Sequence, residues 1–351
     1  MRLSIVTDAW APQVNGVVRT LQTVVARLEA MGHQVQLITP SLFRSLPCPT
    51  YPEIRLAFAT RRRVERLIEA FAPDALHIAT EGPLGLAARR ACVRRSVPFT
   101  TAFHTRFPDY VAARTKLPPR LLWRYIRWFH APARHVLTAT PRLAHELHEH
   151  GIASTAHWTR GVDLTLFHSG AKPHPALATL PRPIQLCVGR VAVEKNLEAF
   201  LSNTHPGTKV VVGDGPALSS LILKYPNAAF LGALHGEQLA SAYASADVFV
   251  FPSKTDTFGL VMIEALASGV PVAAYPVPGP LDVLGEDGRG VIAGWNTPVG
   301  AVDETLEAAI AAALRCERAA CADYARNFSW ENSTAQFLSA LTPIEPTALA
   351  A

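Results

Sequence analysis

The chain lacks several features that define other classes of protein. No apolar run reaches the ~18 residues of a membrane-spanning helix. The first residues do not show the charged and then apolar pattern of a signal peptide. The five cysteines form no C-x-x-C pair, which favours free thiols in a reducing compartment. With 49% hydrophobic and only 17% charged residues, the 351-residue chain is expected to form two packed domains and to be cytoplasmic.

Two ligand-binding motifs are also missing. The glycine fingerprint G-x-G-x-x-G is absent from the first strand-to-helix loop, which argues against a nicotinamide dehydrogenase. No Asp-x-Asp motif occurs, so we do not expect a metal ion to bind a diphosphate group in this protein. Basic side chains would neutralise such a group instead. We therefore expect neither a metal nor an organic cofactor.

Acidic residues are scarce in the first half of the chain. Residues 1–168 hold 22 Lys and Arg against 11 Asp and Glu, a net charge of +11, whereas residues 169–351 carry −6. Such asymmetry predicts an anionic surface as the partner of the first half, either nucleic acid or a membrane.

Short apolar runs alternate with amphipathic helical stretches, a pattern typical of parallel sheets covered by helices on both faces. The expected strands of the first series are Leu3–Val6, Val35–Ile38, Ala75–Ile78, Phe99–Phe103 and Val136–Leu137. Those of the second are Ile184–Val188, Val210–Val212, Ala229–Leu231, Val248–Phe251 and Pro271–Ala274. The sequence thus predicts an α/β protein with two doubly wound, Rossmann-like domains facing a central cleft.

The proline-containing stretch 164–183 interrupts this alternation and predicts the linker between the domains. We expect one domain over 1–168 and a second over 169–328. Residues 329–351 are expected to form a terminal helix and tail that pack back on the first domain.

The strand Val248–Phe251 leads into a loop and a helix that carry two acids. Asp256 stands before the expected helix start, and Glu264 about two turns into it. Backbone amides at a helix start bind hydroxyls or phosphates, and the acids can accept hydrogen bonds from sugar or ribose hydroxyls. The alternative is a capping Asp and a solvated helix Glu. The amides concerned belong to Phe258, Gly259 and Leu260.

Two further strand-to-helix junctions carry candidate donor-binding residues. Arg190 and Lys195 follow the strand Ile184–Val188 and could hold a diphosphate leaving group, although each could equally form a surface salt bridge. Gly213 permits a tight turn near a ligand. In the first domain, Gly16 opens a helix where backbone could approach a phosphate. His104 directly follows a strand, and its alternative is a structural histidine.

Together these residues make the chain similar to glycosyltransferase family 4, of the GT-B fold. Each motif is modest, but their joint order along most of the chain is specific. The resemblance rests on the opening loop Thr7–Val17, Phe103-His104-Thr105, Arg160-Gly161-Val162-Asp163, Val188-Gly189-Arg190 with Glu194-Lys195-Asn196, Gly213-Asp214-Gly215-Pro216, and Asp256 to Glu264.

The resemblance implies a role for each site residue. Arg190 and Lys195 would neutralise the donor diphosphate, Asp256 would bind sugar hydroxyls with the amides of residues 258–260, and Glu264 would hold the ribose. Gly16 would approach the diphosphate, Gly213 would lie in the donor loop, and His104 would contact the sugar. The family's signature has Glu where this chain has Asp256. That variant resembles a branch with glucuronosyl- and sulfoquinovosyl-diacylglycerol synthases and GDP-mannose-dependent mannosyltransferases.

A basic, aromatic-rich segment in the first domain predicts contact with a membrane surface. Residues 110–145 contain no Asp or Glu but seven Arg or Lys. The alternatives are a core-facing helix with a solvated basic face and a single-stranded nucleic acid site, which we rank lowest. The residues expected at the membrane are Arg120, Trp123, Arg124, Arg127 and Trp128.

Taken with this resemblance, the sequence predicts a metal-independent glycosyltransferase on the inner face of the plasma membrane, and the resemblance implies that it retains anomeric configuration. We expect its acceptor-binding and membrane-associating domain over 1–168 and its nucleotide-sugar-binding domain over 169–328. The enzyme would move glucose or glucuronate from a UDP-sugar to a lipid such as diacylglycerol, and nucleic acid is not expected as a partner. The alternatives are a GDP-mannose-dependent α-mannosyltransferase acting on a glycolipid or saccharide, a sugar-nucleotide epimerase, and a non-catalytic peripheral membrane protein that binds sugar nucleotides.

Overall fold

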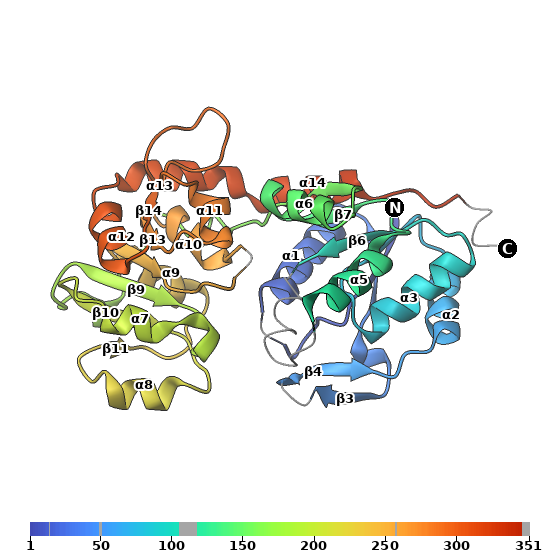
Figure 1. The fold of residues 1–351 in the computed structure, drawn as a ribbon, viewed down its shortest axis with the longest axis horizontal. Helices are drawn as coiled ribbons and strands as arrows, with labels where there is room; N and C mark the ends of the chain where they lie inside the picture. The colour runs from blue at the N-terminus through green and yellow to red at the C-terminus, as the bar shows by residue number, and fades with distance from the viewer. Residues whose placement is uncertain (14, 49–50, 105–117, 257, 346–351) are drawn as a thin grey trace. The chain divides into compact units, whose positions relative to one another are not determined.

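The computed structural model describes residues 1–13, 15–48, 51–104, 118–256 and 258–345 (Figure 1). The chain divides into two units. The first comprises Met1–Thr159 and Glu331–Ala351, and the second Arg160–Trp330. Each unit is built on a six-stranded sheet whose strand pairs are all parallel. Within the described residues, no helix combines the length and apolar character that crossing a bilayer requires.

The first sheet has the strand order β2-β1-β5-β6-β7-β8. Its strands are largely buried and apolar, as expected where helices cover both faces. The strands are β1 (Arg2–Val6), β2 (Gln34–Ile38), β5 (Ala75–Ile78), β6 (Thr100–Phe103), β7 (Val136–Thr138) and β8 (Thr155–His157). The helices are α1 (Gly16–Ala30), α2 (Arg61–Phe71), α3 (Pro83–Arg94), α5 (Pro119–His130), α6 (Pro141–Glu149) and α14 (Trp330–Ala340).

Local sequence sets the ends of α1. The Asn15 side chain accepts hydrogen bonds from the amides of Val17 and Val18, both at 3.0 Å, and so caps the first turn. After the helix, Gly32 has φ +84°, a conformation that a glycine adopts without steric cost. Asn15 therefore marks where α1 begins, and Gly32 marks the turn that follows its end.

The C-terminal helix α14, red in Figure 1, belongs with the first unit. Phe337 of α14 packs edge-on against His77 of β5, with ring centroids 5.0 Å apart, and against Trp158 at 4.9 Å. The amide of Ile344 donates to the carbonyl of Asp74 at 2.8 Å. His77 is fully buried, and burial lowers its pKa to about 3, so it is neutral in this packing.

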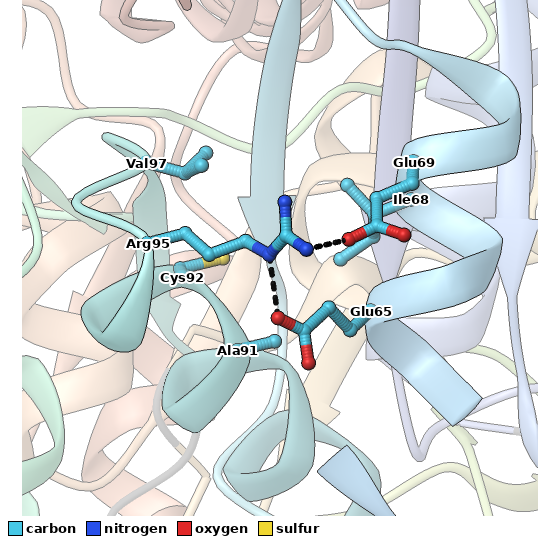
Figure 2. Close-up of a pocket in the computed structure, with 7 residues that line it drawn as sticks. All are labelled: Glu65, Ile68, Glu69, Ala91, Cys92, Arg95 and Val97. Atoms are coloured by element: carbon cyan, nitrogen blue, oxygen red, sulfur yellow. Dashed lines mark hydrogen bonds and ion pairs between the residues drawn. The ribbon is translucent and has the colours of Figure 1, made fainter. Parts of the chain in front are cut away.

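Helices α2 and α3 are joined by ion pairs around one arginine. Arg95 Nε donates to Glu65 at 2.5 Å, and the same guanidinium contacts Glu69 one helical turn further along α2 (Figure 2). The Arg95 hydrogen bond holds the pKa of Glu65 below its usual value. The void beneath has a volume of about 10 Å³ and lies against buried Cys92 and Val97. That space admits roughly one water molecule, so this feature is structural.

A two-stranded antiparallel hairpin, which the strand pattern did not predict, lies apart from the first sheet (Figure 1). It consists of β3 (Ser45–Cys48) and β4 (Tyr51–Ala57). Ala57 is buried and joins the apolar cluster that contains Val64 and Ile68 of α2. One face of the hairpin is therefore anchored in the core.

The second sheet has the strand order β11-β10-β9-β12-β13-β14. The strands are β9 (Ile184–Val188), β10 (Thr208–Val212), β11 (Ala229–Phe230), β12 (Val248–Phe251), β13 (Val272–Ala274) and β14 (Gly300–Val302). The helices are α7 (Leu197–Ser202), α8 (Leu218–Lys224), α9 (Gly236–Ser245), α10 (Leu260–Ala267), α11 (Pro278–Leu284), α12 (Leu306–Ala313) and α13 (Arg318–Ala325). The strands β9 and β12 lie at the centre, so the loops that follow them meet at one edge of the sheet.

Candidate active site

The loops after β9 and β10 touch each other through their backbones. Gly189 and Gly213 have φ values of +152° and +148°. A Cβ on Gly213 would overlap the carbonyl oxygen of Gly189, and a Cβ on Gly215 would overlap that of Val191. Only glycine therefore fits at these two positions. The contact holds the exposed Arg190 at the carboxyl end of β9.

Lys195 and Asp256 form the central ion pair of the second unit. The Lys195 Nζ lies 2.7 Å from one carboxylate oxygen of Asp256 and 2.8 Å from the other. Both side chains are partly shielded, with 30% and 25% of their surfaces exposed. The next residue, Asn196, has φ +53°, and its side-chain amide donates to the carbonyl of Pro252 at 3.1 Å. This bond ties the Lys195 turn to the loop that carries Asp256.

The start of α10 presents backbone amides without a capping side chain. The residue at the cap is Gly259, with φ +80°, and α10 begins at Leu260. The Phe258 side chain is buried and packs against Phe328, with ring centroids 6.2 Å apart. Its burial anchors the loop, so the amides of residues 258–260 are fixed at the positive end of the helix dipole.

Glu264 is buried, with 2% of its surface exposed. The Tyr243 hydroxyl donates to a Glu264 carboxylate oxygen at 3.0 Å. The alternative of a solvated surface glutamate is therefore wrong. Glu264 also lies little more than one turn into α10, because the helix starts later than the sequence pattern predicted.

In the first unit, Asp8 occupies the carboxyl end of β1 at the start of α3. Its carboxylate accepts hydrogen bonds from the amides of Leu84 and Gly85, at 2.9 and 3.1 Å, and from Thr80 Oγ1 at 2.9 Å. Burial raises the pKa of Asp8, while the two amides oppose that shift. A Cβ on Gly82 would come within 2.5 Å of this carboxyl carbon. Asp8 thus fixes the β1 and β5 loops together.

His104 lies at the carboxyl end of β6, buried edge-on against Trp158 with ring centroids 5.4 Å apart. Nearby, His130 lies 2.8 Å from Thr101 Oγ1 through Nδ1 and 3.3 Å from Glu81 through Nε2. Sequence reasoning did not single out Asp8, Glu81, His130 and Tyr243, because each gains its partner only through contacts between residues far apart in the sequence.

The membrane candidates lie on α5. Arg120, Arg124 and Arg127 are exposed, as is 44% of the Trp128 surface. The guanidinium of Arg89 stacks on the Trp128 ring at 3.8 Å. Trp123 is instead stacked on His150 at 3.6 Å, so much of its ring serves packing within the unit. Arg114 and Lys116, two of the seven basic residues of this segment, lie outside the described residues.

One open hollow lies entirely within the first unit, at the carboxyl ends of β7 and β8. Its volume is about 270 Å³, and Thr138, Thr140 and Thr155 line it together with His157. More of its lining surface is apolar than polar, and its lining residues include no Asp, Glu, Lys or Arg.

Each half of the chain matches the sequence model of a known protein family. Residues 14–166 match the sequence model of "Glycosyltransferase Family 4", and residues 174–328 match "Glycosyl transferases group 1". A GDP-mannose-dependent alpha-mannosyltransferase of Corynebacterium glutamicum is 33% identical over 83% of this chain and 76% of its own. The sulfoquinovosyl transferase SQD2 of Arabidopsis thaliana is 32% identical over 79% of this chain and 60% of its own. An alpha-monoglucosyldiacylglycerol synthase of Streptococcus pneumoniae is 26% identical over 79% of this chain and 72% of its own.

Solved structures agree on the fold. The sucrose-phosphate synthase of Thermosynechococcus elongatus superposes with a TM-score of 0.72 at 20% identity, over 96% of this chain and 97% of its own. HepE of Anabaena, solved with UDP-glucose, gives a TM-score of 0.66 at 15% identity, over 97% of this chain and 98% of its own. The expected two-domain fold and family resemblance are confirmed, and the chain belongs to the family 4 glycosyltransferases of the GT-B fold.

Proposed function

We propose that this glycosyltransferase moves a hexose or hexuronic acid from a UDP-sugar to a membrane lipid such as diacylglycerol, with retention of anomeric configuration. The observation that carries the proposal is the Lys195–Asp256 pair, which places a cation and a hydroxyl acceptor 2.7 Å apart at the start of α10. A sugar diphosphate needs both groups side by side, since its phosphates are anionic and its sugar hydroxyls are neutral hydrogen-bond donors.

Lys195 has one N–H left for the donor. An ammonium group carries three hydrogens, and two of them point at the two oxygens of Asp256. The third, together with the positive charge, binds a phosphate oxygen, and Arg190 provides the second cation. Asp256 keeps lone pairs for sugar hydroxyls, and the amides of residues 258–260 bind the remaining oxygens of the donor.

Glu264 holds the ribose by accepting hydrogen bonds from its diol. A buried carboxylate needs fixed donors, and the Tyr243 hydroxyl supplies one of them in the free protein. Tyr243 therefore acts as a positioning residue that aims the carboxylate.

The chemical step needs little from the protein beyond placement and charge. The bond between the sugar C1 and the phosphate oxygen breaks, and C1 forms a bond to the acceptor oxygen on the same face. The acceptor proton passes to the leaving phosphate, which departs as nucleoside diphosphate. Lys195 and Arg190 stabilise the charge that develops on the phosphate, so the step proceeds without a metal ion. In this proposal His104 contacts the sugar, and Gly16, which has no side chain, lets the backbone approach the diphosphate.

The acceptor is a lipid because the first unit carries a basic surface. Exposed Arg120, Arg124 and Arg127 lie on the helix that also exposes Leu121 and Trp128. Such a face binds the headgroup region of an anionic leaflet, with about 1 kcal/mol from each basic residue near the surface. A relative named for monoglucosyldiacylglycerol supports the same acceptor class. The protein then works peripherally on the inner face of the plasma membrane.

A second candidate is mannosyl transfer from GDP-mannose. Its support is the relative of that name at 33% identity, which exceeds the identity to the diacylglycerol synthase. The two candidates differ in donor base and sugar but share the roles of Lys195, Asp256 and Glu264.

The test is a donor-by-acceptor experiment. The purified chain is incubated with diacylglycerol in detergent micelles and, separately, with UDP-glucose, UDP-glucuronate or GDP-mannose. Lipids are identified by mass spectrometry, and NMR of the product gives the anomeric configuration. A glucosyl or glucuronosyl lipid with an α linkage supports the proposal. A product from GDP-mannose alone favours the second candidate, and no lipid product with any donor refutes the lipid acceptor.

A further inference from the structure

The β3–β4 hairpin exposes large apolar side chains on one face. The surfaces of Phe58 and Leu46 are 63% and 57% exposed, and that of Leu42, just before the hairpin, is 42% exposed. A soluble surface normally scatters such residues singly, because contiguous apolar patches promote association. Their grouping on a short hairpin indicates a surface that binds another molecule or a membrane.

The strand register explains why these side chains point outward. Ser45 pairs with Ala57 and Leu46 with Leu56, so the two pairs face opposite sides of the hairpin. Ala57 is 5% exposed and faces the core, so Leu46, 57% exposed, and the half-buried Leu56 lie on the opposite face. Phe58 follows Leu56 by two residues and therefore continues the outward face.

Arginines surround this apolar face. The amide of Phe58 donates to the carbonyl of Arg44 at 2.8 Å, which places Arg44 directly beside the exposed ring. Arg63 donates to the carbonyl of Leu42 at 2.7 Å, which brings the first turn of α2 to the same edge. Arg62 and Arg66 are exposed one turn apart on α2 and share one face of the helix.

Among the residues that the structure describes, the exposed arginines Arg44, Arg62 and Arg66 have no acidic partner. The acids of α2, Glu65 and Glu69, are bound by Arg61 and Arg95. The first turn of α2 holds three arginines and no acid. Their positive charges lie at the positive end of the helix dipole, which is unfavourable, and bound anions from outside the protein would offset this repulsion.

We propose that the outward face of the hairpin and the start of α2 form a membrane-docking surface, distinct from α5, that inserts Phe58, Leu46 and Leu42 among lipids. Arg44, Arg62 and Arg66 would bind the phosphates of anionic headgroups. Apolar side chains ringed by unpaired arginines match the layered chemistry of an anionic leaflet, with phosphates outside and acyl chains within. The inference rests on the proposed lipid acceptor, which requires the enzyme to remain at the bilayer.

Vesicle flotation tests this surface with the full-length chain. The vesicles contain phosphatidylcholine and phosphatidylglycerol in equal parts, and phosphatidylcholine alone serves as the uncharged comparison. Phe58→Ser should weaken binding by about tenfold or more, because a side chain of this size is lost from the apolar layer. Arg44→Gln and Arg62→Gln should each weaken binding to the anionic vesicles about fivefold, the ~1 kcal/mol of one surface arginine.

Matched controls come from the second unit. Leu223, with 83% of its surface exposed on α8, is replaced by Ser, and the exposed Arg315 by Gln. Both controls should bind vesicles like the wild type. Wild-type binding by Phe58→Ser and Arg44→Gln would overturn the proposal. A dimer that dissociates in Phe58→Ser, seen by analytical ultracentrifugation without vesicles, would also overturn it, since the face would then contact a second copy.

Transfer in detergent micelles separates this inference from the proposed function. All hairpin variants should glycosylate micellar diacylglycerol at the wild-type rate and lose activity only on vesicles. If the wild type makes no glycolipid in micelles yet binds vesicles through this face, the proposed acceptor fails while the docking surface stands. If transfer occurs in micelles and vesicle binding ignores the substitutions, the docking surface fails alone.

Discussion

Replacing Gly279 with alanine should impair catalysis through the Asp256 loop. A Cβ on Gly279 would come 2.6 Å from the backbone carbonyl oxygen of Asp256, whereas ordinary contacts begin at 3.4 Å. The backbone of Gly279 needs no positive φ, so the clash is the main perturbation. The loop must retreat by about 0.8 Å, and displacements near 1 Å cost about 10²-fold in rate. We expect kcat/KM to fall about 10- to 100-fold.

The same substitution should cost about 1–3 kcal/mol of stability, as overpacking usually does. Activity is measured by donor and acceptor titration, and stability by thermal unfolding. Gly170→Ala is the control, because its Cβ would meet only the flexible His168 side chain, at 3.3 Å. A Gly279→Ala variant with wild-type kcat/KM and a lowered Tm would refute the link between this packing and the position of Asp256.

Three further substitutions test other contacts. His77→Gln should flatten the fall in stability on acidification, because only the unfolded chain protonates His77 between pH 6.5 and about 3. Urea unfolding should show the wild type losing about 1 kcal/mol more than the variant between pH 6.5 and 5.5. Arg95→Ala should lower Tm, whereas its neighbour Arg94→Ala should not, by differential scanning calorimetry. Tyr243→Phe should raise the donor KM several-fold with little change in kcat, since it removes a hydrogen bond to Glu264.

The parallel strands followed from the sequence because buried strands leave continuous apolar runs. All ten expected strands match observed ones within two residues at each end, and Phe99–Phe103 differs from β6 only in its first residue. The hairpin did not follow, since Pro47 and the exposed apolar residues obscure a two-residue alternation. Strands β8 and β14 were also missed, because their sequences, Thr-Ala-His and Gly-Ala-Val, contain no run of large apolar residues.

The proline-containing stretch shows a different limit of the pattern. Residues 164–183 lack regular periodicity, yet the structure places them in the second unit. Leu177 is buried, and the His174 amide donates to Ser245 Oγ at 2.7 Å. The units divide instead at Thr159 and again at Trp330. Prolines mark irregular backbone, but whether that backbone packs depends on contacts from distant residues.

The sequence predicted which loops carry the candidate site residues, but not which of those residues contact each other. Each of Arg190, Lys195, Asp256 and Glu264 follows an apolar strand, which places it at the carboxyl edge of a sheet. The Lys195–Asp256 ion pair joins residues 61 positions apart, and nothing local encodes it. The same holds for the Tyr243 hydroxyl on Glu264, because Tyr243 lies on a different helix.

The most direct test of the account compares initial rates of sugar transfer for Lys195→Ala and Lys224→Ala. Lys224 is the control, an exposed lysine of the same unit that pairs with Glu198 on the surface. We predict that Lys195→Ala lowers kcat/KM at least about 100-fold, the usual cost of removing one group that stabilises transition-state charge, while Lys224→Ala leaves it unchanged. A Lys195→Ala enzyme that transfers sugar within twofold of the wild-type rate would contradict the account.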